Sequence, residues 1–395
     1  MNKLPYGRQS ISDKDIEAVV NVLKSDWLTT GPIVEKFEQI LSNTTNANYA
    51  VSCSSGTAAL HLAVLSLGIG AGDQVIVPSL GFVAIANAVR LTGADVVFAD
   101  VDSQNGMITL ETLKHAYETS LYPDKICAVI VLHLNGQSAK MDDIKEYSDK
   151  HNWRIIEDAC HVIGGTQPFQ NKEIAIGGCV YSDIAIFSFH PVKTITTAEG
   201  GALLTNNADI AEKAKMYRNH GITRNIEKYQ NKDILENVPP WYYEQQLLGL
   251  NYRLTDMQCA LGISQLDQLC YFVQRRDELY SCYEEAFSSF GTNFKLIKKT
   301  SWGNPAWHLC SLLIDFNKIQ KSKSELMIEL MEQGITTQVH YIPIYQQPYY
   351  QKLYSQPPLK GCERYYEQQL SLPLYPAMEM EDVKFVVEAL VQSVS

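Results

Sequence analysis

The sequence lacks an excess of positive charge. Its 395 residues include 33 lysines and arginines against 44 aspartates and glutamates, which gives a formal net charge of −11. Proteins that bind nucleic acid or anionic membranes by general electrostatic attraction need a basic face. We therefore expect neither nucleic acid nor a membrane as a partner. An anionic small molecule stays open, because helix N-terminal N–H groups and hydroxyls can bind a phosphate.

Clustered cysteines and long apolar runs are also missing. The nine cysteines are scattered and never spaced C-x-x-C, a pattern that disfavours a disulfide scaffold or a structural zinc site. We expect reduced, mostly buried thiols and no metal. No apolar stretch approaches the ~20 residues of a membrane-spanning helix, and the first residues lack the apolar core of a signal peptide. A cytoplasmic location is the resulting prediction.

Short apolar segments do occur, and from Tyr49 onwards they alternate with amphipathic stretches in a chain that is 46% hydrophobic. Parallel strands require helical crossovers of this kind, and their carboxyl ends form a ligand crevice. We predict an α/β fold with a mostly parallel seven-stranded sheet and helices on both faces. The predicted strands are Tyr49–Cys53, Gln74–Pro78, Ala94–Ala99, Ala128–Leu132, Arg154–Glu157, Ile184–Phe189 and Ala202–Thr205.

Further regions precede and follow this sheet. Ser12 and Asp15 indicate an N-capped helix near the start of the chain. A polar stretch over 221–246 predicts a long loop of the kind tied to function or to a partner subunit. A helix from Met257 is expected to bridge to a smaller lobe. That lobe has predicted short strands at 309–314 and 336–340. The predicted domains are an N-terminal arm with the first helix (1–32), a large α/β domain (33–255), and a linking helix with a smaller C-terminal α+β domain (256–395).

A turn of small residues, Ser54-Ser55-Gly56-Thr57, follows the first predicted strand. Small side chains allow a phosphate to approach the free N–H groups of a helix's first turn, and hydroxyls add hydrogen bonds. An ordinary N-cap with a tight turn explains the same residues, and for this segment alone it is the more frequent case.

Asp158 follows the apolar strand Arg154–Glu157. A buried carboxylate at this position needs a cationic or hydrogen-bonding partner, and a protonated pyridine nitrogen is one such partner. The alternative is a helix N-cap. His161, three residues later, either contacts a ligand oxygen or is packed and hydrogen-bonded in the core.

Lys193 lies in a turn between two predicted strands, in the segment Ser188-Phe189-His190-Pro191-Val192-Lys193. A lysine dehydrated by its neighbours has a lowered pKa and can attack a carbonyl. A surface lysine in a β-turn is the alternative. Nearby threonines and the pair Gly200-Gly201 constrain the turn and favour the first interpretation.

These segments and the polar cluster Gly249–Gln258, in this order, resemble the pyridoxal-phosphate-dependent nucleotide-sugar aminotransferases of the DegT/DnrJ type. The likeness runs from Pro5 to the C-terminal helix. It implies an aspartate-aminotransferase-like fold (fold type I), with a large domain that binds pyridoxal 5′-phosphate. Lys193 would carry this cofactor as a Schiff base and move protons, while Asp158 keeps the pyridine nitrogen protonated. By the same resemblance, the cofactor would be contacted by Gly56, Thr57 and Ser188 at the phosphate, Phe82 on the ring, His161 near the phenolic oxygen, and Asn251 across a dimer interface.

Within this family, the segments Leu23–Pro32 and Gly334–Gln346 are most similar to the transaminases that make UDP-4-amino-4,6-dideoxy sugars for pseudaminic acid synthesis. The resemblance implies transfer of an amino group from L-glutamate to the C4 keto group of a UDP-linked sugar, with pyridoxamine 5′-phosphate formed in the half-reaction. It also implies a homodimer with shared active sites. The implied substrate-binding residues are Tyr6, Asp26, Trp27, Leu28, Thr29, His308, His340 and Tyr341.

Other functions stay open at this point. A different aminotransferase, for a dTDP- or GDP-linked 3- or 4-keto sugar, would have nearly the same active-site segments. A non-catalytic nucleotide-sugar-binding protein of the same fold is disfavoured, because Lys193, Asp158 and Ser188 occur together. A metal hydrolase is disfavoured because the histidines show no H-x-x-x-H spacing.

Overall fold

A computed structural model describes residues 3–288 and 293–394. Its centre is a seven-stranded sheet in the order β1-β9-β8-β5-β4-β2-β3. Strand β9 runs antiparallel to β1 and β8, whereas the pairs from β8 through β3 are all parallel. All seven predicted strands form, with ends within two residues of those expected: β1 (Tyr49–Cys53), β2 (Gln74–Pro78), β3 (Asp95–Ala99), β4 (Ile126–Leu132), β5 (Arg154–Asp158), β8 (Ile184–Ser188) and β9 (Gly201–Thr205).

The sheet is buried on both faces, as the uninterrupted apolar strands require. Along β8, Ile184 and Ile186 belong to one apolar core, and Ala185 and Phe187 belong to another. This alternation follows from the period of two residues in a strand. The first core includes residues of helices α3 (Gly56–Ser66), α4 (Ala84–Leu91), α5 (Leu110–Glu118), α6 (Met141–Lys150) and α7 (Ala208–Arg218), and the second includes residues of α2 (Pro32–Thr45) and α8 (Asp256–Asp267).

Helix α1 (Asp13–Leu23) packs along α8. Its predicted N-cap is confirmed: Ser12 and Asp15 form a capping box. The Asp15 carboxylate is fully buried and accepts a hydrogen bond of 2.9 Å from the side-chain amide of Gln265. The cap that begins this helix therefore also anchors it to the body of the protein.

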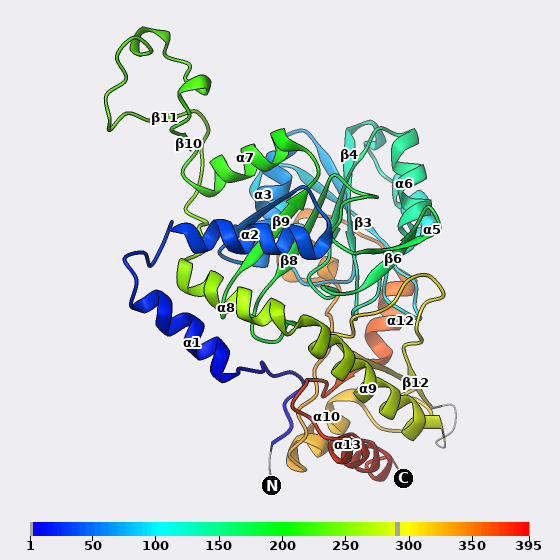
Figure 1. The fold of residues 1–395 in the computed structure, drawn as a ribbon. Helices are drawn as coiled ribbons and strands as arrows, with labels where there is room; N and C mark the ends of the chain where they lie inside the picture. The colour runs from blue at the N-terminus through cyan, green and yellow to red at the C-terminus, as the bar shows by residue number, and fades with distance from the viewer. Residues whose placement is uncertain (1–2, 289–292, 395) are drawn as a thin grey trace.

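A smaller lobe lies at the C-terminal end of the chain (Figure 1). Its three-stranded antiparallel sheet has the order β12-β13-β14. Leu4, from the start of the chain, lies in the core of this lobe and pairs with Ile335. The elements of this part of the chain are β12 (Phe294–Leu296), β13 (Cys310–Ile314), β14 (Gln369–Leu372), α10 (Lys323–Glu332), α11 (Pro348–Leu353), α12 (Lys360–Gln368) and α13 (Met380–Gln392). The boundaries of the predicted domains stay a prediction.

The structure corrects two expectations. The predicted strand at 336–340 is wrong: Gln338 forms only an isolated bridge with Ser371. The N–H of Val339 donates to the side chain of Gln338, and the N–H of His340 donates to the side chain of Gln369, so neither bonds a neighbouring strand. The helix expected to link the lobes ends at Asp267, and α9 (Leu269–Ser288) makes the link, since its first half packs in a large-domain core and its second half in the smaller lobe.

The long loop predicted over 221–246 is present. It contains a two-residue ladder between β10 (Ile222–Thr223) and β11 (Glu244–Gln245), and Figure 1 shows this segment projecting away from the body. A second small ladder joins β6 (Thr166–Phe169) to β7 (Lys172–Ala175).

All nine cysteines lie in the described residues and are free there, and five of them are buried. Within residues 3–288 and 293–394, no helix is both long and apolar enough to span a bilayer.

Candidate active site

A cavity of about 770 Å³ opens where β5 and β8 end and α3 begins. Most of the site residues predicted from the sequence line this cavity. We call two groups of its lining residues the cavity floor and the cavity roof. The floor, from the sheet and the segments that follow its strands, comprises Gly56, Thr57, Asp158, Ser188 and Lys193, and the roof, from the N-terminal segment and the smaller lobe, comprises Tyr6, His308, His340 and Tyr341.

The N-terminus of α3 forms one end of the floor. Ser55 caps this helix, because its hydroxyl accepts the N–H of Ala58 at 3.0 Å. The first-turn N–H groups of Gly56 and Thr57 are not used by the helix's own hydrogen bonds. A Cβ atom at Gly56 would lie 2.8 Å from Cβ of Ser188. Only glycine therefore lets the helix terminus approach Ser188 this closely, and the result is an N–H and hydroxyl site suited to a phosphate.

Asp158 lies at the end of β5 and is 4% exposed. Its Oδ1 accepts the N–H of Cys160 at 3.1 Å. Burial raises the pKa of this carboxyl, and the hydrogen bonds from Cys160 and the charge of Lys193 oppose the rise. Turns rather than a helix follow β5, so the N-cap alternative is wrong. A cationic partner in the cavity would favour the ionised carboxylate.

Lys193 lies in a turn that hydrogen bonds hold tightly. Its N–H donates to the carbonyl of His190 at 2.8 Å, and the N–H of Thr197 and the hydroxyl of Thr196 both donate to the carbonyl of Phe189. Burial lowers the pKa of Lys193, although Cys160 and Asp158 act in the opposite direction. A lowered pKa makes the neutral, nucleophilic amine more accessible near neutral pH.

The roof consists of neutral hydrogen-bonding rings. His308 is 4% exposed and His340 is 6% exposed. Burial, followed by the charge of Lys193, lowers the pKa of His340 to about 3 and holds the pKa of His308 well below its ordinary range. His161 joins the roof to the floor, since it follows β5 and its Nε2 lies 3.1 Å from the hydroxyl of Tyr341.

Five predicted residues do not line this cavity. Asp26, Trp27, Leu28 and Thr29 lie on the connection between α1 and α2, where the side chain of Trp27 is 56% exposed. Asn251 is also exposed and forms an isolated bridge with Asn219.

Several lining residues were not predicted. Ser55 had a local signal, because a serine before Gly-Thr at a helix start is a typical N-cap. Cys160, Glu199, Gln338 and Gln347 also line the cavity. Cys160 lies between Asp158 and His161, and Gln338 lies within the segment Gly334–Gln346, so the local signal was there but did not single out these two side chains. Glu199 and Gln347 are brought to the cavity by tertiary packing.

The cavity fits the cofactor that the sequence resemblance implies. A phosphate matches the α3 terminus beside Ser188, and a protonated ring nitrogen matches the buried carboxylate of Asp158. The side chain of Phe82, 58% exposed, presents an aromatic face at the cavity. The buried Nδ1 of His161 has no hydrogen-bond partner among the described residues. It can therefore accept a hydrogen bond from a ligand hydroxyl or donate one to a ligand oxygen. Lys193 supplies the amine for the aldehyde.

Comparisons with known proteins give consistent results. The model of the DegT/DnrJ/EryC1/StrS aminotransferase family matches residues 9–391. A UDP-4-amino-4,6-dideoxy-N-acetyl-β-L-altrosamine transaminase of Campylobacter jejuni is 35% identical, covering 98% of this chain and 96% of its own. The spore coat polysaccharide biosynthesis protein SpsC of Bacillus subtilis is 36% identical with the same coverage. Among solved structures, Helicobacter pylori PseC, an aminotransferase of pseudaminic acid biosynthesis, has a TM-score of 0.87 and 28% identity over 99% of both chains.

Proposed function

The chain belongs to the DegT/DnrJ/EryC1/StrS aminotransferase family and is a pyridoxal-phosphate-dependent transaminase, and we propose a specific substrate for it. The proposed reaction moves an amino group from L-glutamate to the C4 keto group of a UDP-linked 2-acetamido-2,6-dideoxy-hexos-4-ulose. The product is a UDP-4-amino-4,6-dideoxy sugar of the pseudaminic acid pathway. The family and the fold class predicted from the sequence are confirmed.

One observation supports the chemistry above all others: a single cavity joins the amine of Lys193, the carboxylate of Asp158 and the N-terminus of α3. When bound, pyridoxal 5′-phosphate supplies an electron sink, which stabilises the negative charge left on a substrate carbon that loses its proton. The α3 terminus and Ser188 would bind its phosphate. Asp158, accepting a hydrogen bond from the ring nitrogen, would keep that nitrogen protonated.

Lys193 has two roles in this proposal. Its Nζ would hold the cofactor covalently in the resting enzyme, and the same atom, as a free amine, would move a proton to or from the reacting carbon of the substrate. The lowered pKa of Lys193 supports both roles, because the amine must be neutral to attack and to accept a proton.

The roof supports a sugar substrate. His308 and His340 stay neutral because burial lowers the pKa of each, so with Tyr6 and Tyr341 they offer hydrogen bonds without adding charge. Such groups suit sugar hydroxyl, keto and acetamido oxygens. The UDP assignment is supported by the similarity to the Campylobacter jejuni transaminase and to PseC.

We further propose a homodimer in which each subunit completes its partner's site. Asp26–Thr29 and Asn251 are exposed and lie outside this chain's own cavity, so a second copy can receive them. The projecting β10–β11 segment exposes Trp241 at 77%, and nearby Leu248 is 87% exposed. A subunit interface would cover such large apolar side chains. The free cysteines fit the proposed cytoplasmic location, where thiols stay reduced.

Amination assays with a panel of keto-sugar nucleotides test the proposed substrate. We expect product formation from L-glutamate and the UDP-linked 4-keto sugar, and much less from dTDP- or GDP-linked 3- and 4-keto sugars. A preference for one of those would replace the UDP assignment. Failure to aminate any sugar, with an intact fold, would favour the non-catalytic binding protein. Lys193→Ala is the negative control for each substrate.

A further inference from the structure

A buried segment of the chain lies next to Asp158. It follows β4, and every residue from 131 to 139 is buried. Connecting segments usually run over the surface, because a buried one must satisfy all its polar groups internally. The segment 133–139 includes a histidine that is fully buried, His133. The proposed mechanism does not use this ring, and it does not line the cavity.

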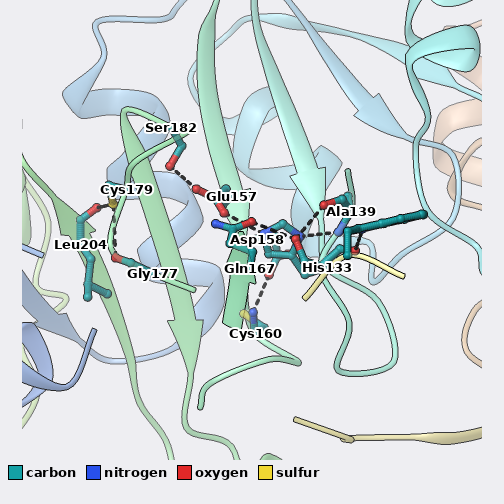
Figure 2. A network of polar contacts seen from close by, with 12 residues as sticks. His133, Ala139, Glu157, Asp158, Cys160, Gln167, Gly177, Cys179, Ser182 and Leu204 are labelled. Atoms are coloured by element: carbon teal, nitrogen blue, oxygen red, sulfur yellow. Dashed lines mark hydrogen bonds and ion pairs between the residues drawn. The ribbon is translucent and has the colours of Figure 1, made fainter. Parts of the chain in front are cut away.

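The two ring nitrogens of His133 have different partners (Figure 2). The N–H of Ala139 donates to Nδ1 at 3.1 Å, so Nδ1 is unprotonated. The proton of the neutral ring is then on Nε2, which donates to Oε2 of Glu157 at 2.8 Å. The hydroxyl of Ser182 donates to Oε1 of the same carboxylate at 2.5 Å. Glu157 is fully buried, and both its oxygens are hydrogen-bonded.

This network holds the end of β5 on two sides. Glu157 and Asp158 are consecutive strand residues, so their side chains point to opposite faces of the sheet. The ring of His133 bonds Glu157, and the main-chain N–H of His133 donates to the carbonyl of Asp158 at 3.0 Å. His133 therefore fixes both the side chain of Glu157, on the opposite face of the sheet, and the main chain of Asp158.

We propose that His133 is a positioning residue for cofactor binding: through Glu157 it fixes the strand end so that the Asp158 carboxylate meets the ring nitrogen of pyridoxal phosphate. The proposal rests on the proposed function of this cavity. A hydrogen bond to a cationic ring nitrogen requires the carboxylate to lie in the correct direction, and supporting residues commonly set such directions. The strand backbone carries Asp158, so its placement determines where the carboxylate points.

Three variants separate this role from a merely structural one. In His133→Asn, the shorter side chain keeps an acceptor near the position of Nδ1 and no longer reaches Glu157. In His133→Gln, the amide reaches Glu157 as Nε2 does and the acceptor for Ala139 is lost. Ser138→Ala is the matched control, because Ser138 bonds Gln167 and the Ala139 carbonyl in the same buried segment without contacting Glu157 or Asp158.

The measurement is the affinity of the apoprotein for pyridoxal phosphate, followed by the visible absorption of the bound cofactor and its pH titration. We expect His133→Asn to weaken binding about tenfold and shift the pH titration, and His133→Gln to bind within about twofold of the unchanged protein. Ser138→Ala should lower the thermal unfolding midpoint and leave the affinity unchanged.

Normal affinity and pH titration in His133→Asn would overturn the proposal, even if that variant unfolds at a lower temperature. Equal weakening in His133→Gln or in Ser138→Ala would also overturn it, because the effect would then not pass through Glu157. Absence of cofactor absorption in the unchanged protein would overturn the proposed function, and with it this role of His133. If the unchanged protein shows the normal cofactor absorption, the proposed function stands, and a failed His133 test then concerns the role of His133 alone.

Discussion

The floor and the roof of the cavity differ in how the chain builds them. Floor residues lie at strand ends or in the segments that follow, and hydrogen bonds within the sheet fix the main chain that carries them. Roof residues come from three segments, around residues 6, 308 and 340. The floor contains a carboxylate and an amine, whereas the histidines of the roof stay neutral. We therefore expect the floor to supply the groups that make and break bonds, and the roof to recognise the substrate.

The largest effect on turnover is expected when the amine of the floor, Lys193, is removed. Lys193→Ala should reduce turnover at least about a thousandfold, because both the attachment of the cofactor and proton transfer are lost. The control is Lys323→Ala: Lys323 lies in α10 outside the cavity, and burial lowers its pKa to about 8. Steady-state assays with both variants decide whether turnover requires a lysine at the position of Lys193 or is lost whenever a lysine with a lowered pKa is removed. Substantial activity in Lys193→Ala would contradict the mechanism.

A second substitution removes the floor charge. Asp158→Asn should lower turnover on the order of a hundredfold, since a neutral amide cannot stabilise the protonated ring nitrogen as a carboxylate does. Asp143→Asn is the control, because this carboxylate pairs with Lys140 at the surface. Turnover and cofactor affinity are measured for both. Equal values for the two variants would show that the charge of Asp158 is not used.

The roof should make the protein sensitive to acid. The pKa of His340 is about 3 in the folded protein and near 6.5 when unfolded. The unfolded state therefore binds a proton first, and stability that is fully present above pH 6.5 is lost as the pH falls towards 3. His340→Gln should reduce the loss of unfolding free energy between pH 7 and pH 5 by about 2 kcal/mol. Denaturant unfolding at both pH values measures it, and parallel pH profiles would refute the assignment.

The smallest effect is expected from a single roof contact. His308→Ala should raise the KM for the keto sugar about tenfold, the cost of one hydrogen bond in a buried site. The half-reaction with L-glutamate should change less than about twofold, because this part of the cycle uses the floor. Single-turnover and steady-state kinetics compare the two. An equal loss in both half-reactions would mean that roof and floor are not functionally separate.

The same division explains what could be predicted from the sequence. The strands of the sheet, and the positions of Gly56, Asp158 and Lys193 at strand ends or in turns, follow from local patterns, because apolar runs, small-residue turns and strand-end polar residues are short-range signals. The roles of His308 and His340 rested on resemblance alone. The strand predicted at 336–340 failed because the Gln369 side chain takes the His340 N–H. This long-range contact leaves no trace in the local pattern.

The segment 133–139 connects the two parts of the cavity. His133 holds the strand end that carries Asp158, and the carbonyl of Asn135 accepts the N–H of His308 at 3.1 Å. The side chain of Asn135 also accepts the hydroxyl of Ser311 at 2.8 Å. Two residues apart in the sequence, His133 and Asn135 thus contact the main chains of one floor residue and one roof residue.

The pairing of Leu4 with Ile335 has a consequence for the order in which the protein folds. The N–H of Leu4 donates to the carbonyl of Gly334 and its own carbonyl accepts the N–H of Thr336, both at 2.8 Å. During synthesis, the segment around Leu4 leaves the ribosome long before its partner exists. Contacts between such distant parts of a chain form late and slow folding. The core of the smaller lobe is thus completed only after residues 334–336 have been made, with a residue that was translated long before them.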